Sequence, residues 1–112
     1  MEPIDGHRPD GTPVRVDVSS GHRVVWFLTS SCRPCQAVWP RLGPLDVAVT
    51  PSPSTESRRK VAALAPAGVE VVMSSDTWFR FEAGPAPWRV EILDGRIVGS
   101  GPGVTGVRPD RP

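Results

Sequence analysis

Two cysteines, Cys32 and Cys35, are the residues with the clearest chemistry in this 112-residue sequence. They follow the apolar run 24–28, which predicts a buried strand, and they precede a segment with helical character. A dithiol at the beginning of a helix meets free backbone N–H groups and partial positive charge, which favour a thiolate over a thiol. We therefore expect disulfide exchange, with Cys32 as the exposed nucleophile and Cys35 as the buried thiol that resolves a mixed disulfide.

The residues between the cysteines, Arg33 and Pro34, are expected to tune the pair. Arg33 adds positive charge beside Cys32, and Pro34 fixes the backbone at an early helical position where no N–H is required. Two other interpretations are inert core cysteines and half of a zinc site. An inert pair would not explain the placement at a strand-to-helix turn. A structural zinc site needs four ligands, and His7 and His22 lie upstream without the spacing of a ligand pair, so we assign no metal.

Alternating strand-like and helix-like segments must hold the dithiol in place. Strand patterns occur at 12–18, 24–28, 45–50, 69–73, 88–93 and 96–98. Helical patterns occur at 36–42, 54–65 and 77–79. Pro40 should bend the first helix, and Asp94-Gly95 between the last two strands predicts a tight hairpin. The predicted fold class is α/β, with a mixed central sheet flanked by helices and a C-terminal β-hairpin.

Composition limits the number of domains and the kinds of partner. We expect a single domain over 1–106 and a flexible tail over 107–112. The charges of thirteen basic and twelve acidic residues nearly cancel. The sequence therefore shows no basic excess of the kind that binds nucleic acid or an anionic membrane surface. No stretch approaches the ~18 apolar residues of a membrane span, and the N-terminus lacks the apolar segment of a signal peptide. Localisation stays open between a cytoplasmic protein and an excised extracytoplasmic domain.

Together these features resemble the thioredoxin superfamily over roughly 13–101. The strand at 24–28, the motif Cys32-Arg33-Pro34-Cys35 and Pro40 five residues later match that family's central strand, active site and kinked helix. The segments 10–13 and 94–98 resemble the extracytoplasmic branch that serves cytochrome maturation and related tasks. The resemblance implies a thioredoxin-like fold.

The same resemblance assigns the substrate groove. The family places a cis-proline opposite the dithiol, followed by a glycine turn, and Pro87 precedes Gly95 by the matching eight residues. Pro87 would therefore be the cis-proline, and the backbone of Ala86 would pair with a substrate as an extra strand. Trp88 is assigned to the groove as well, although packing in the core is an equal alternative. Core packing is the default for Trp26 and Trp39.

Two departures from the family pattern affect the expected chemistry. Trp26 stands where thioredoxins carry a buried aspartate, so proton transfer at Cys35 needs another group or water. Glu82 and Glu91 are the nearest candidates in the sequence, but glutamates are more often solvated surface residues. The Gly- and Pro-rich segment 99–112 cannot form the family's final helix. An apolar sheet face would then be left uncovered, to be buried by a partner, by a second copy in a homodimer, or by chain that is absent from this sequence.

The predicted function is that of a thiol–disulfide oxidoreductase acting on protein or peptide substrates through a Cys32 mixed disulfide resolved by Cys35. It needs no bound cofactor, but it requires a redox partner protein. The alternative is a thioredoxin-like interaction module whose disulfide is structural or redox-sensing and does not turn over. The sequence does not determine the direction of electron flow, because no general rule relates Arg33-Pro34 to a particular reduction potential.

Overall fold

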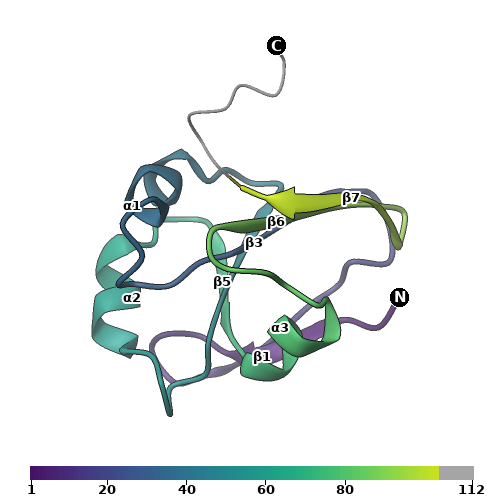
Figure 1. The fold of residues 1–112 in the computed structure, drawn as a ribbon. Helices are drawn as coiled ribbons and strands as arrows, with labels where there is room; N and C mark the ends of the chain where they lie inside the picture. Colours follow the sequence, from purple (N-terminus) through teal and green to yellow (C-terminus); the bar gives the residue numbers. More distant parts are fainter. Residues whose placement is uncertain (104–112) are drawn as a thin grey trace.

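The computed structural model describes residues 1–103, which form one seven-stranded mixed sheet (Figure 1). The strand order is β2-β1-β5-β4-β3-β6-β7. The strands are β1 (Ile4–His7), β2 (Pro13–Val16), β3 (His22–Phe27), β4 (Asp46–Thr50), β5 (Glu70–Met73), β6 (Trp88–Leu93) and β7 (Arg96–Pro102). The helices are α1 (Cys35–Val38), α2 (Arg58–Leu64) and α3 (Ser75–Arg80), and a 3-10 turn, η1, spans Trp39–Arg41. None of these helices has the length and apolar character needed to cross a membrane.

Three parallel strands in the interior of the sheet position the site. β4 pairs in parallel with β3 on one side and with β5 on the other. β6 pairs antiparallel with β3, and β7 continues the sheet as a hairpin. Since the carboxyl ends of parallel strands meet at one edge of a sheet, the loop after β3 and the loop after β4 lie together there. The dithiol follows β3 at this edge.

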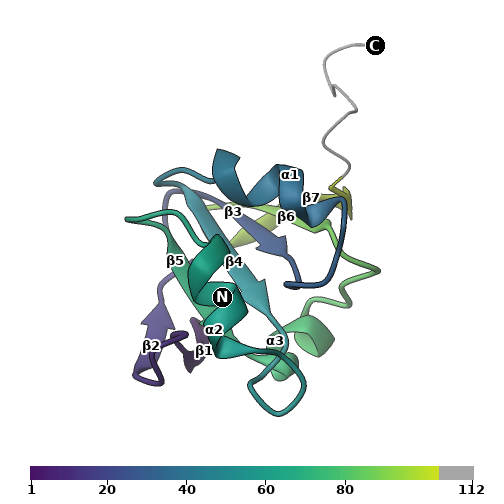
Figure 2. The same ribbon diagram turned by 90° about the vertical axis from the view of Figure 1, so that its left-hand side faces the viewer.

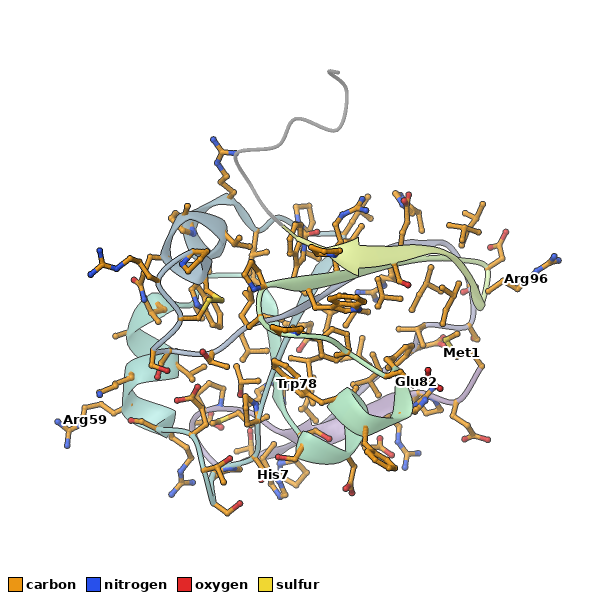
Figure 3. All side chains as sticks on the ribbon, in the orientation of Figure 1. Met1, His7, Arg59, Trp78, Glu82 and Arg96 are labelled. Atoms are coloured by element: carbon orange, nitrogen blue, oxygen red, sulfur yellow. A yellow bond between two sulfur atoms is a disulfide. The ribbon has the colours of Figure 1, made fainter. Side chains whose placement is uncertain are left out.

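Helices cover both faces of the sheet and divide the core into two parts. α1 and α2 lie on one face (Figures 1 and 2), over what we call the dithiol core. Its buried members are Leu28, Cys35, Val38, Trp39, Leu42, Ala48, Val61, Val71 and Met73. α3 covers the other face, over the opposite core, and Figure 3 shows Trp78 pointing from α3 toward the sheet. There its ring meets Phe27 edge-on, with the ring centres 5.3 Å apart.

Alternation along the strands explains how the sheet serves two cores. Val47 and Val49 belong to the opposite core, and Ala48 between them belongs to the dithiol core. Along β5, Val72 faces the opposite core, whereas its neighbours Val71 and Met73 face the dithiol core. Side chains of a strand point to the two faces in turn, so an interior strand with apolar residues throughout can pack helices on both sides.

The mixed α/β fold class is confirmed, and the helices differ from expectation in their bounds. α1 ends at Val38, and the chain continues as the 3-10 turn in which Pro40 takes an early position. Pro40 therefore ends the α-helix instead of only bending it, because a proline has no N–H for the next intrahelical bond. α2 begins at Arg58, later than predicted, since the Ser57 side chain accepts from the Lys60 N–H and caps it.

The ends of the sheet show one element that the sequence analysis missed and one that is longer than predicted. β1 pairs antiparallel with β2, with Ile4 opposite Val16. β7 extends to Pro102, so the first part of the Gly- and Pro-rich segment is strand. The predicted tail 107–112 lies outside the described residues. The hairpin turn is confirmed, with positive φ angles at Asp94 (49°) and Gly95 (79°).

Candidate active site

The two cysteines form a disulfide at the beginning of α1. Their Cα atoms are 5.2 Å apart. Cys32 is partly exposed, whereas Cys35 is fully buried in the dithiol core at 0% exposure. The two cysteines therefore differ in exposure as predicted, with Cys32 half-buried and Cys35 buried.

Two hydrogen bonds hold Cys32 in the loop before α1. The Cys35 N–H donates to Cys32 Sγ at 3.1 Å, and the Cys32 N–H donates to Thr29 Oγ1 at 3.1 Å. α1 spans only Cys35–Val38, so the contribution of a helix dipole is small, and the N–H of Cys35 is the donor seen at the sulfur. Pro34 adopts helical φ and ψ angles before α1, and Arg33 is exposed beside Cys32.

Ala86 and Pro87 lie in the segment that leads from α3 into β6. The Ala86–Pro87 peptide bond is cis, as the family resemblance implies for this position. Pro87 is buried, and its carbonyl accepts from the Gly103 N–H at 2.8 Å. Ala86 packs against the dithiol core, as Cys32 does. The structure thus brings Ala86 to the same face of the sheet as the dithiol.

Trp88 lies on the other face of the sheet. Its side chain packs against the opposite core, together with Val90 and Ile92 of the same strand. The indole also lies close over Gly84, where an added Cβ would come 2.5 Å from the ring. Trp88 is therefore a half-buried residue that packs on the face of the sheet opposite the dithiol core.

Trp26, at the position where the family resemblance would have an aspartate, is only half-buried. Its indole N–H donates to Asp46 Oδ1 at 3.1 Å, and the Arg89 guanidinium lies over the ring at 5.8 Å. Further along this face, Glu91 bonds to His22 at 2.7 Å and to Arg89 at 3.5 Å. Among the described residues, this part of the face therefore carries polar and charged side chains beside a half-buried indole.

Neither glutamate that the sequence suggested for proton transfer lies at the dithiol. Glu91 stands opposite Val24 in the register of β6 with β3, toward the end of β3 that is remote from Cys32. Glu82 follows α3 on the opposite face with a left-handed backbone, φ 52°. Figure 3 shows it far across the molecule from α1. The carboxylate near the dithiol is a different residue.

That carboxylate is Glu56, in the loop between β4 and α2. It accepts from the Ser30 N–H at 2.8 Å and from the Ser30 hydroxyl at 2.6 Å. Ser30 is two residues before Cys32, so Glu56 binds the loop that carries the dithiol. The sequence analysis did not single it out. Its position in the loop after β4 could have indicated this contact, because loops that follow neighbouring parallel strands meet at one edge of the sheet.

The carboxylates whose pKa is shifted lie away from the dithiol. The N–H and hydroxyl of Thr12 donate to Asp10 and lower the pKa of that carboxyl. The hydroxyl and N–H of Ser19 lower the pKa of Asp17 in the same way. Both are surface turns near the N-terminal hairpin, so these shifts are local features of turn structure.

No family model and no curated protein matches the sequence. Solved structures do match. A Chlorobium tepidum protein assigned as a thiol:disulfide interchange protein DsbE has 21% identity and a TM-score of 0.74, covering 96% of this chain and 83% of that one. A secreted Mycobacterium tuberculosis disulfide oxidoreductase homologous to DsbE has 18% identity and a TM-score of 0.72, with 91% and 84% covered.

A third match is the exposed lipoprotein thioredoxin Etrx1 of Streptococcus pneumoniae. It has 16% identity and a TM-score of 0.69, covering 90% of this chain and 89% of that one. At these identities the likeness establishes the fold, which is thioredoxin-like. The expected fold is therefore confirmed.

Proposed function

We propose that this chain is a thiol–disulfide oxidoreductase that exchanges disulfides with protein or peptide substrates. The observation that carries the proposal is the unequal exposure of the two cysteines of one disulfide, with Cys32 half-buried and Cys35 fully buried. The Cys35 N–H aimed at Cys32 Sγ favours negative charge on that sulfur. Structural neighbours named as thiol–disulfide proteins add support.

In the reducing direction, the Cys32 thiolate attacks one sulfur of a substrate disulfide. The substrate S–S bond breaks, a mixed disulfide with Cys32 forms, and the first substrate sulfur leaves as a thiolate. The Cys35 thiol then loses its proton and attacks Cys32 Sγ. The mixed disulfide breaks, the Cys32–Cys35 disulfide forms, and the substrate gains two electrons together with one proton lost by Cys35 and one taken from water. In the oxidising direction the same steps run in reverse.

Ala86 and Pro87 are the proposed contacts for the substrate backbone. Ala86 shares the dithiol core with Cys32, and a peptide that extends the sheet beside it would bring its own cysteine to Cys32 Sγ. Arg33, exposed beside Cys32, would meet the substrate as well. No bound cofactor enters these steps, so a second dithiol or disulfide protein is needed to restore the starting state.

The reduction potential of the Cys32–Cys35 pair tests the proposal. The protein is equilibrated in glutathione buffers of defined ratio, and its free thiols are counted by alkylation. A reversible couple between about −120 and −270 mV supports an exchange catalyst. A disulfide that resists reduction below about −300 mV would be structural, and the protein would then be an interaction module without turnover.

Variants of the two cysteines give a second, independent test. Cys35→Ser should accumulate a mixed disulfide through Cys32 when it is incubated with an oxidised peptide, because the resolving thiol is absent. Cys32→Ser should form none, since the remaining sulfur is buried. Equal trapping by both variants would contradict the assigned order of attack. Mass spectrometry under non-reducing conditions distinguishes these outcomes.

A further inference from the structure

Ser30 holds the loop that carries the dithiol in place through all of its polar groups. Its N–H and hydroxyl donate to Glu56 at 2.8 and 2.6 Å. Its carbonyl accepts from the Gln36 side-chain amide at 3.2 Å. The loop before Cys32 is therefore fastened both to the loop between β4 and α2 and to α1 itself.

Three hydrogen-bond donors meet the two side-chain oxygens of Glu56. Besides the two donors of Ser30, the Ser57 N–H donates to Glu56 Oε1 at 2.8 Å. A carboxylate accepts at both oxygens and has no proton of its own, whereas a glutamine presents an NH₂ donor at one of the two positions. Bonds to an ionised acceptor are also about twice as strong as neutral ones. One negative charge thus joins the dithiol loop to the residue that caps α2.

We propose that Glu56 is a positioning residue for the dithiol, which keeps Cys32 next to Cys35 when the pair is reduced. The inference rests on the proposed function and deepens it. Forming a disulfide costs less conformational freedom when the two thiols are already held together, so their effective concentration is higher. Releasing Ser30 should therefore make the disulfide less stable and the reduction potential less negative.

A pure charge effect would move the potential in the same direction and must be separated from positioning. Removing a negative charge near Cys32 favours the thiolate, and so it favours the reduced form. Ser30→Ala distinguishes the two, because it removes one anchoring bond and leaves the charge of Glu56 in place. Glu70→Gln is the matched control. Glu70 is a partly exposed carboxylate at the beginning of β5, the end of the parallel strands remote from the dithiol, where it pairs with Arg8 at 3.6 Å.

The experiment measures the reduction potentials of the wild type, Glu56→Gln, Ser30→Ala and Glu70→Gln in glutathione buffers. We expect Glu56→Gln to lower the equilibrium constant for disulfide formation about three- to tenfold, a shift of about +15 to +30 mV at ~30 mV per tenfold change. Ser30→Ala should shift in the same direction by a smaller amount. Glu70→Gln should stay at the wild-type value.

A wild-type potential in Glu56→Gln would overturn the inference. A shift in Glu56→Gln with none in Ser30→Ala would also overturn it, because charge alone would then be responsible. Thermal unfolding verifies that each variant is folded, and Ser30→Ala decides the question by itself if Glu56→Gln does not fold. Failure of the proposed function is a separate result, since it is the wild type that would then show no reversible couple.

Discussion

Reduction of the Cys32–Cys35 disulfide should lower the free energy of unfolding by only about 2 kcal/mol. The cysteines are 3 positions apart, and the chain-entropy relation gives ~2 kcal/mol at 25 °C for so short a loop. The dithiol loop keeps its other anchors, such as the bond from the Cys32 N–H to Thr29. With an unfolding entropy of ~2.1 cal/mol/K per residue, the difference corresponds to a Tm lower by about 8 °C.

Urea unfolding followed by circular dichroism, with and without dithiothreitol, measures this difference. The double variant Cys32→Ser/Cys35→Ser is the matched control, and its unfolding curve should coincide with that of the reduced wild type in both buffers. A loss above about 4 kcal/mol, or unfolding on reduction, would refute the reasoning, because a short loop cannot supply that much by chain entropy. The disulfide would then be a structural bond, and the interaction module would be the better description.

Three further measurements test individual turns and hydrogen bonds of the structure. Gly95→Ala should lower the free energy of unfolding by about 1–2 kcal/mol, because an alanine is strained at a φ of 79°. Gly99→Ala is the control in the same urea titration and should change that free energy little, because the space around Gly99 is open. Trp26→Phe should lower the free energy of unfolding by about 1 kcal/mol, because it removes the part-buried hydrogen bond from the indole N–H to Asp46. The pKa of Asp10, lowered by Thr12, should rise in Thr12→Val as followed by NMR. The stability that the bonds from Thr12 to Asp10 contribute is present above the unfolded-state pKa of Asp10. It is lost as the pH falls through the folded-state pKa of Asp10.

Local patterns predicted the elements next to the dithiol. The run 24–28 is β-branched and aromatic, as expected of a strand covered on both faces, and β3 spans His22–Phe27 between β4 and β6. Asp94-Gly95 specifies its turn by backbone conformation alone. β1 was missed because Ile4 is its only buried residue. A strand of four residues is too short to show a period of two in its sequence. β1 is defined instead by its antiparallel pairing with β2.

The site was less predictable, because parts of it depend on contacts between distant segments. Ser30 and Glu56 are 26 positions apart, and only the parallel pairing of β3 with β4 brings their loops together. The position of Trp88, in contrast, could have been predicted. It alternates with Val90 and Ile92, both apolar, so the period of two already assigns its side chain to a buried face.

Among the described residues no carboxylate is fully buried, which limits how Cys35 could lose its proton in the proposed exchange. Among residues 1–103, the buried polar side chains are Thr50, Ser74 and Thr77, and none of them titrates near neutral pH. The indole N–H of Trp26 donates to Asp46, which lies at the end of β4 remote from the dithiol. Of the groups that the exchange reaction itself brings to Cys32, the departing substrate thiolate is the strongest base. In the proposed exchange, the proton of Cys35 would therefore pass to that thiolate or to water.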